Sequence, residues 1–317
     1  MPAQVEEREL RPRRLRATQG FVAHMTFCWR HPSLTALEVG WRWLFGVPFL
    51  LVMWGQIQQI LLRIPTDSVG LSRLSYQNPW LSSALLYDAA GAYHPAVAEV
   101  LRWLAPAGAV VWAVISGIGR TIVLARMNRL SDNPSPHRFL IRAPGVIVLQ
   151  FVWILGLLAV FWAWYQGVAW AAATHLNVDA TGNEPEMIGY LIWLILISLG
   201  LYIAWAMVSW VLSIAPFILL YDNCSAASAL GRSIRLGREF SGKLVEINLV
   251  MSIVKIALIV LAMVFSSVPL PFSDNISPGG LKDLYVGIAI AYLIANDYFH
   301  VVRLKSFMEL WRHYNPS

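Results

Sequence analysis

Six apolar runs constrain this chain more than any other feature of its sequence. Each run is about 20 residues long, enough to cross the roughly 30 Å hydrocarbon core of a bilayer as a helix. Apolar residues make up 57% of the 317 residues and charged residues only 13%, and the mean hydropathy is +0.57. Since so few charges cannot cover a water-exposed surface, the sequence predicts an all-α polytopic membrane protein. The expected spans are 41–62, 101–124, 145–165, 188–212, 244–268 and 284–302.

The distribution of lysine and arginine gives these spans an orientation. Of the 24 basic residues, 19 fall on one side, four on the other, and Lys255 lies within the fifth span. Positively charged flanks are retained in the cytoplasm, so both termini are expected there. We expect a multi-pass protein of a bacterial inner membrane. The net charge of +6 then reflects topology, and no nucleic-acid partner is expected.

The apolar runs and their basic flanks divide the chain into three parts. Residues 1–40 are expected as a basic cytoplasmic segment, residues 41–303 as the six-span transmembrane domain, and residues 304–317 as a cytoplasmic tail. Cys28 and Cys224 both fall on the cytoplasmic side, where thiols stay reduced. The chain is therefore predicted to hold no disulfide framework.

No pattern in the sequence indicates catalysis or a bound cofactor. The seven histidines form no HExxH pair, and the nucleophile-elbow, phosphate-loop and dinucleotide patterns are lacking. Asp179, Glu184 and Glu186 could bind a divalent cation, but their spacing fits no calcium loop, which favours a solvated acidic loop. Gly117 and Gly119 fall at helix depth, where small residues permit close helix packing. We therefore expect no catalytic residue, metal or cofactor.

Aromatic residues are numerous, with 15 Trp, 11 Tyr and 13 Phe. Many lie near the ends of the expected spans, as interfacial belts and helix packing would place them. The alternative, an aromatic cage for a substrate, would require convergent polar partners that the sequence does not reveal.

Residues 222–240 are predicted to form a cytoplasmic helix lying along the membrane. Asp222, Asn223 or Ser225 can cap its start, and its apolar residues recur at helical spacing. Its basic residues, Arg232, Arg235 and Arg238, recur every third position. Because arginine near an anionic leaflet is attracted by about 1 kcal/mol, these side chains could hold lipid headgroups or a partner. The alternative is that they only set topology.

The segment around this helix resembles a known family. Pro216, Asp222, Ala229, Leu230 and the pair Arg232-Ser233 match, in order, a habit of YciC-like bacterial proteins and of the membrane domains attached to some glycerophosphodiester phosphodiesterases. The resemblance covers residues 215–254. It implies a six-helix bundle with a membrane-accessory role and brings no catalytic residue with it. The chain lacks a phosphodiesterase domain, so that reaction is not implied.

Two charges inside the expected spans form a candidate ion pair. Lys255 lies 12 residues after Lys243, about 18 Å into the membrane, and Asp297 lies in the next span. Side chains lean toward their own helix N-terminus, and the two spans run in opposite directions, which narrows the difference in depth. Alternatively, Lys255 reaches carbonyls or water, and Asp297 pairs with Arg120 or caps a polar end.

The sequence thus predicts a non-enzymatic integral membrane protein, an accessory or assembly component with membrane lipids and other membrane proteins as partners. The runner-up is a small transporter or channel with a polar path near Lys255 and Asp297. An intramembrane enzyme acting on lipids would require convergent catalytic groups, which the sequence does not supply.

Overall fold

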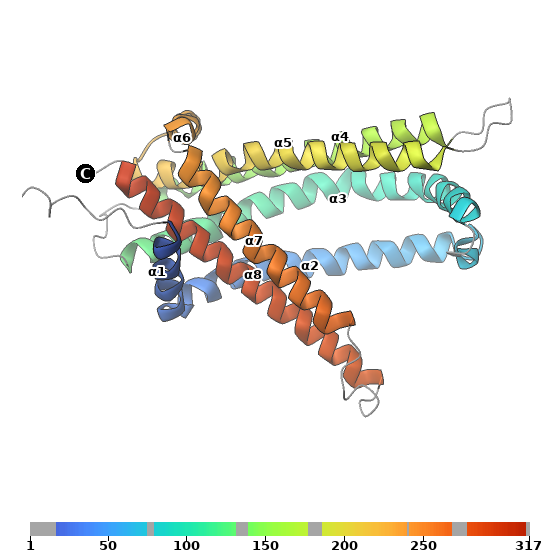
Figure 1. Ribbon diagram of the computed structural model, residues 1–317, viewed down its shortest axis with the longest axis horizontal. Coiled ribbons are helices and arrows are strands. Elements are labelled where there is room, and N and C mark those ends of the chain that lie inside the picture. The colour runs from blue at the N-terminus through green and yellow to red at the C-terminus, as the bar shows by residue number, and fades with distance from the viewer. Residues whose placement is uncertain are drawn as a thin grey trace, which may run out of the picture. The chain divides into compact units, whose positions relative to one another are not determined.

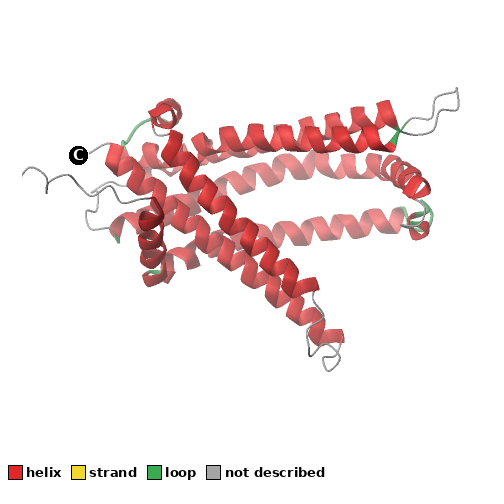
Figure 2. Ribbon diagram, in the orientation of Figure 1, coloured by secondary structure: helices red, strands yellow, loops and turns green. Residues whose placement is uncertain are grey.

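The chain folds as an all-α protein. Regular structure in the described residues is entirely helical, with eight α-helices and two short 3-10 helices (Figure 2). The computed structural model describes residues 17–74, 79–130, 139–176, 186–239, 241–267 and 278–314.

Six of these helices are long and apolar enough to cross a membrane. They are α2 (Pro32–Arg63), α3 (Pro79–Arg129), α4 (Ala143–His175), α5 (Met187–Tyr221), α7 (Ser241–Ser267) and α8 (Pro278–Tyr314). The two shorter α-helices are α1 (Ala17–Arg30) and α6 (Ala226–Glu239). Each long helix contains most or all of one expected span, which confirms the polytopic all-α class and identifies an integral, multi-pass membrane protein.

The helices extend beyond the expected spans. α3 begins at Pro79, so it includes residues that were expected in an external loop, and α5 continues through Pro216 to Tyr221. α8 continues to Tyr314, so most of the expected tail is helical. Hydropathy marks only the part of a helix that suits lipid, whereas backbone hydrogen bonding and packing carry a helix further.

Large apolar side chains are exposed along the long helices. In α2, Leu50, Leu51 and Trp54 are more than 60% exposed, and in α5 Met207 is 69% exposed. A water-soluble protein rarely tolerates so extensive an apolar surface. Lipid chains accept it, because each helix satisfies its own backbone hydrogen bonds.

Two compact units make up the chain. The four-helix unit comprises residues 41–121 and 138–230, with most of α2 and α3 and all of α4 and α5. The α8 unit comprises residues 1–40, 122–137 and 231–317, with α1, α7, α8 and the adjoining ends of α2, α3 and α6. Figure 1 traces the helices in chain order.

Glycines bring the helices of the four-helix unit close together. A Cβ atom at Gly117 in α3 would lie 2.5 Å from Cγ1 of Ile147 in α4, closer than real atoms approach. Gly119, two residues further along α3 and therefore on nearly the opposite side of the helix, lies against the ring of Trp41 in α2. These contacts confirm the prediction that small residues at these positions permit close packing.

Three tryptophans in contact continue this packing from α3 to α5, the first pair stacked and the second edge-on. The ring centroids of Trp112 and Trp153 are 5.0 Å apart, and those of Trp153 and Trp205 are 5.5 Å apart. The three rings therefore fill the space between consecutive helices, which is the packing role expected of aromatic residues here.

A polar clamp fixes the chain where α5 ends and α6 begins. Arg142 Nε donates to Oδ1 of Asn223 at 2.6 Å, and Nη2 of the same arginine donates to the Asn223 carbonyl at 3.1 Å. Asn223 has φ of 53°, a left-handed conformation that asparagine tolerates better than most residues. The backbone N–H of Ser228 donates to Ser225 Oγ, so Ser225 is the cap of α6 among the three candidates.

The core of the α8 unit lies along the C-terminal part of α8. α7 and α1 both pack against α8, and α1 also contacts α7. The α8 side chains Leu304, Phe307 and Met308 are no more than 2% exposed. Residues of the expected cytoplasmic tail are therefore helical and packed in this core.

Candidate functional site

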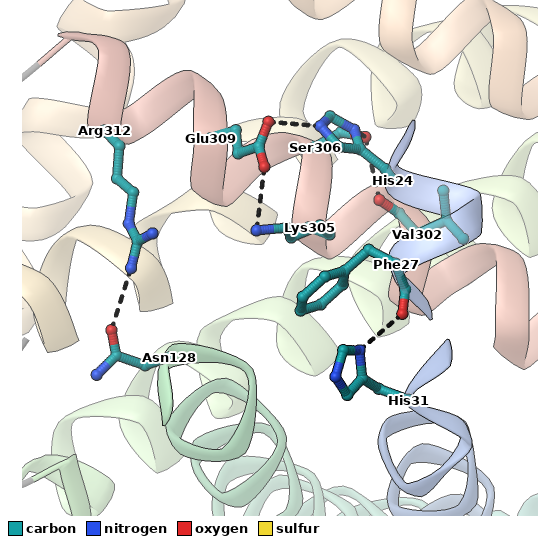
Figure 3. Close-up of polar contacts among 9 residues, drawn as sticks. All are labelled: His24, Phe27, His31, Asn128, Val302, Lys305, Ser306, Glu309 and Arg312. Atoms are coloured by element: carbon teal, nitrogen blue, oxygen red, sulfur yellow. Dashed lines mark hydrogen bonds and ion pairs between the residues drawn. The ribbon is translucent and has the colours of Figure 1, made fainter. Parts of the chain in front are cut away.

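A histidine ties α1 to the last turns of α8 (Figure 3). His24 Nδ1 lies 2.8 Å from Ser306 Oγ, and its Nε2 lies 2.6 Å from Oε2 of Glu309. The Ser306 hydroxyl donates to the Val302 carbonyl, so it accepts from His24, and a carboxylate can only accept. Each ring nitrogen of His24 therefore has a polar partner on α8.

Lys305, one turn before Glu309 on α8, also contacts the Glu309 carboxylate. Its Nζ lies 3.0 Å from Oε1 of Glu309, the oxygen that His24 leaves available, and 4.5 Å from the ring centroid of Phe27 in α1. The lysine is only 6% exposed, whereas the Glu309 side chain is 48% exposed. The Glu309 carboxylate thus contacts both His24 and Lys305 at the edge of the α1–α8 contact.

Cys28 lies on the packed side of α1 and is fully buried. Burial raises the pKa of its thiol from 9.0 to about 12, and the charge of Lys305 opposes the shift by favouring the thiolate. Because the thiolate is the reactive form, this cysteine is unsuited to act as a nucleophile.

A second polar group joins the start of α2 to α8. Oε1 of the fully buried Glu38 lies 3.5 Å from Nε2 of His300, and Arg303 Nη2 donates to His300 Nδ1 at 3.2 Å. Because Nδ1 accepts, the proton of a neutral His300 resides on Nε2, facing the acid. The three groups form a row in which the imidazole of His300 lies between the guanidinium of Arg303 and the carboxyl group of Glu38.

The end of α3 reaches the end of α8 within the same unit. Arg312 Nη2 donates to Oδ1 of Asn128 at 3.3 Å (Figure 3). α1, the start of α2 and the ends of α3 and α8 therefore meet through side chains. The sequence predicts all four segments on the side of the membrane where it places 19 basic residues.

The three arginines of the expected lipid contact lie on one face of α6. Arg232, Arg235 and Arg238 are all exposed. The buried face of α6 lies opposite and consists of Ala229, Ser233, Leu236 and Gly237. Ile234, which shares a helix face with Leu230 at i, i+4, is 47% exposed, so the packed face of α6 is not the one that carries these two residues.

Lys255 and Asp297 lie on neighbouring helices. Lys255 is on α7 and partly buried, and Asp297 is on α8 and 4% exposed. α7 and α8 pack side by side (Figure 1), so the predicted ion pair joins two elements that are in contact. It stays a prediction.

Sequence reasoning missed the residues that join α1 and α2 to α8. His24 and Glu309 are 285 positions apart, and neither belongs to a recognisable motif. One sequence feature could have indicated the contact with α2. Asp297, His300 and Arg303 recur at every third position, which places three ionisable residues on one face of α8.

The polar groups of the described residues join helices to one another. In these parts of the chain, no three His, Cys, Asp or Glu residues are grouped so that they could hold a metal ion. Of the acidic loop, Asp179 and Glu184 lie outside the described residues, and Glu186 pairs with His175 at 2.9 Å. Comparisons with family models, curated proteins and solved structures found no match to this chain.

Proposed function

We propose that the protein is a non-enzymatic accessory or assembly component of a bacterial inner membrane, and that it binds anionic lipid headgroups through α6. One observation carries this proposal. Arg232, Arg235 and Arg238 form an exposed basic row on the side of α6 opposite its buried face. Membrane lipids and other membrane proteins are the partners that such a surface suits.

The chemistry of arginine explains the choice of ligand. A guanidinium group donates several hydrogen bonds in a plane and matches the oxygens of a phosphate. Each arginine near an anionic leaflet contributes about 1 kcal/mol, and three on one row contribute about 3 kcal/mol. A packed inner face holds the row in one orientation, which limits the entropy lost on binding.

The side chains that meet in the α8 unit support the proposed sidedness. His24 of α1 contacts α8, Asn128 of α3 contacts Arg312, and Glu38 of α2 lies beside His300. The positive-inside rule assigns all these segments to the cytoplasm. A membrane-accessory role is also what the resemblance of residues 215–254 implies.

The test replaces Arg232, Arg235 and Arg238 together by Gln in the full-length protein. We expect the variant to retain less phosphatidylglycerol in native mass spectrometry, because the summed attraction is removed. The matched control replaces Arg63, Arg73 and Arg102 by Gln, three exposed arginines on the opposite side of the predicted topology. Equal retention by wild type and the α6 variant, or equal loss in both variants, would contradict the proposal.

A second candidate function is a small transporter or channel. It is favoured by ionisable groups that are almost fully buried on facing helices, namely Asp297 at 4% exposure and Glu38 at 0%. Buried ionisable residues in membrane helices commonly mark ion or proton paths. Reconstituted vesicles whose ion or proton permeability rises with the protein, and falls with Asp297→Asn, would support this function over the first.

A further inference from the structure

We propose that α1 is an interfacial helix whose outer face inserts into the headgroup layer of the anionic cytoplasmic leaflet. This outer face consists of Val22, Thr26, Trp29 and Arg30. The inference uses the sidedness of the proposed function but concerns a different helix and a different set of residues.

The spacing of the outer face makes it one stripe. Positions 22, 26, 29 and 30 follow the i, i+4, i+7, i+8 pattern of a single helix side. All four residues are exposed, and Trp29 is 78% and Val22 61% exposed. Tryptophan and a flanking arginine are the combination that interfacial helices place at the level of the headgroups.

The inner face of α1 is held by α8, which fixes the direction of the stripe. His24 contacts Ser306 and Glu309, and the Tyr298 hydroxyl donates to the Met25 carbonyl at 2.8 Å. α1 therefore does not need its outer face for packing. A helix pinned along one side presents the other side in a single orientation.

The contacts along α8 set the depth of α1. Trp29 makes an edge contact with Tyr298, with ring centroids 6.2 Å apart, and Tyr298 lies inside the expected sixth span. Tyr298 precedes Arg303 by five residues, about 7.5 Å along the helix. His24, at the other part of α1, contacts residues beyond that span. Since Tyr298 contacts both Met25 and Trp29 while His24 contacts residues after the span, α1 crosses α8 where the expected sixth span ends, at the membrane boundary.

Charge identifies the leaflet as the occupant of this face. Arg30 lies on the stripe, and Arg8, Arg11, Arg13, Arg14 and Arg16 precede α1 in the sequence. An apolar stripe combined with basic residues binds anionic membranes more strongly than neutral ones. The position of Trp29 at the membrane boundary also favours lipid over a protein partner as the occupant of this face.

The test measures the depth of a nitroxide attached to Trp29→Cys in the full-length protein carrying Cys224→Ser. Cys28 stays in place, because it is buried and its thiol has a raised pKa, so it does not take the label. The protein is placed in nanodiscs of phosphatidylglycerol and phosphatidylcholine. Ser72→Cys provides the aqueous reference and Ile256→Cys, on the apolar surface of α7, the deep reference.

We expect the ratio of oxygen to nickel-chelate accessibility at position 29 to exceed that at position 72 several-fold. It should stay below the ratio at position 256 and fall when phosphatidylglycerol is omitted. Val22→Cys, on the same stripe, gives a second reading if the Trp29 variant does not fold. A ratio equal to that at position 72 overturns the inference. A label that neither relaxant reaches also overturns it, because protein would then cover the face.

The outcome is separable from that of the proposed function. If the α6 variant retains phosphatidylglycerol while the accessibility ratio at position 29 is interfacial, only the α6 proposal fails. If the α6 variant loses phosphatidylglycerol while the accessibility ratio at position 29 equals the aqueous reference, only the α1 inference fails. The nitroxide measurement in the α6 variant should be unchanged, because the two helices use different residues.

Discussion

At the scale of single residues, burial rather than chemical type decides what Cys28 can do. Its pKa of about 12, compared with 9.0 for a solvated thiol, reduces the thiolate fraction about a thousand-fold at neutral pH. In protein carrying Cys224→Ser, we expect almost no reaction with a thiol reagent at pH 8 and full reaction after denaturation. Mass spectrometry of the labelled protein measures both.

Cys224 and the pH dependence of stability provide two further checks on the burial of Cys28. Cys224, which is partly exposed, should react in the folded Cys28→Ser protein and serves as the positive control. Because the raised pKa favours the protonated form in the fold, stability should also decline as pH rises from about 9 toward 12. Rapid labelling of Cys28 in the folded protein would show that α1 leaves α8.

Lys255 and Asp297 supply the second prediction for single residues. Lys255→Met or Asp297→Asn alone should destabilise by about 3–5 kcal/mol if each leaves a buried charge unmatched. The double variant should recover much of that loss, because neither charge then remains. Unfolding by denaturant in detergent measures the cycle. Additive losses would show that the two residues do not interact.

At the scale of the elements, close approach of glycines determines how α3 packs. Gly117→Ala should destabilise by about 1–3 kcal/mol, because its Cβ would lie 2.7 Å from the Cα atom of Ile147, and backbone must move. Gly55→Ala is the matched control on α2, where no atom lies within 4 Å. It should be neutral or stabilising by about 0.5–1 kcal/mol, since alanine favours helix. Thermal unfolding compares the two, and equal effects would mean that α3 and α4 are not in close contact.

α6 illustrates the limit of periodicity for an element. The arginine repeat predicts one basic face, and the structure places all three arginines on the exposed side. The buried face could not be predicted in the same way, because it consists of Ala229, Ser233, Leu236 and Gly237 and leaves the equally apolar Ile234 exposed. Size complementarity with a neighbour decides which side packs, and that neighbour is not encoded in the helix itself.

At the scale of the whole molecule, the charge asymmetry gives a direct test of topology. Cys224 should react with a membrane-impermeant thiol reagent only after the cytoplasmic face is opened, whereas Ser72→Cys should react in intact cells. The 19 basic residues on one side oppose translocation of that side. Cys28 is unsuitable for this test because it is buried. Labelling of Cys224 from outside would overturn the six-span orientation.

The sequence by itself determined the class, the number of spans and their approximate positions. These depend on the free energy of transferring each residue into lipid, a property that is summed along the chain without reference to partners. The bounds of α3 and α8 still differ from the expected spans, because packing extends these helices beyond their apolar runs. The cap of α6 was narrowed to three residues and the structure selected Ser225.

Only the tertiary structure brought together the residues of the candidate site. His24 meets Glu309, and Glu38 meets His300, across more than 250 positions of sequence. Such pairs depend on which helix faces pack and at what register, and neither hydropathy nor charge count contains that information. The physical reason is that lipid rewards each apolar residue separately, whereas a buried polar contact requires two side chains to arrive at one place together.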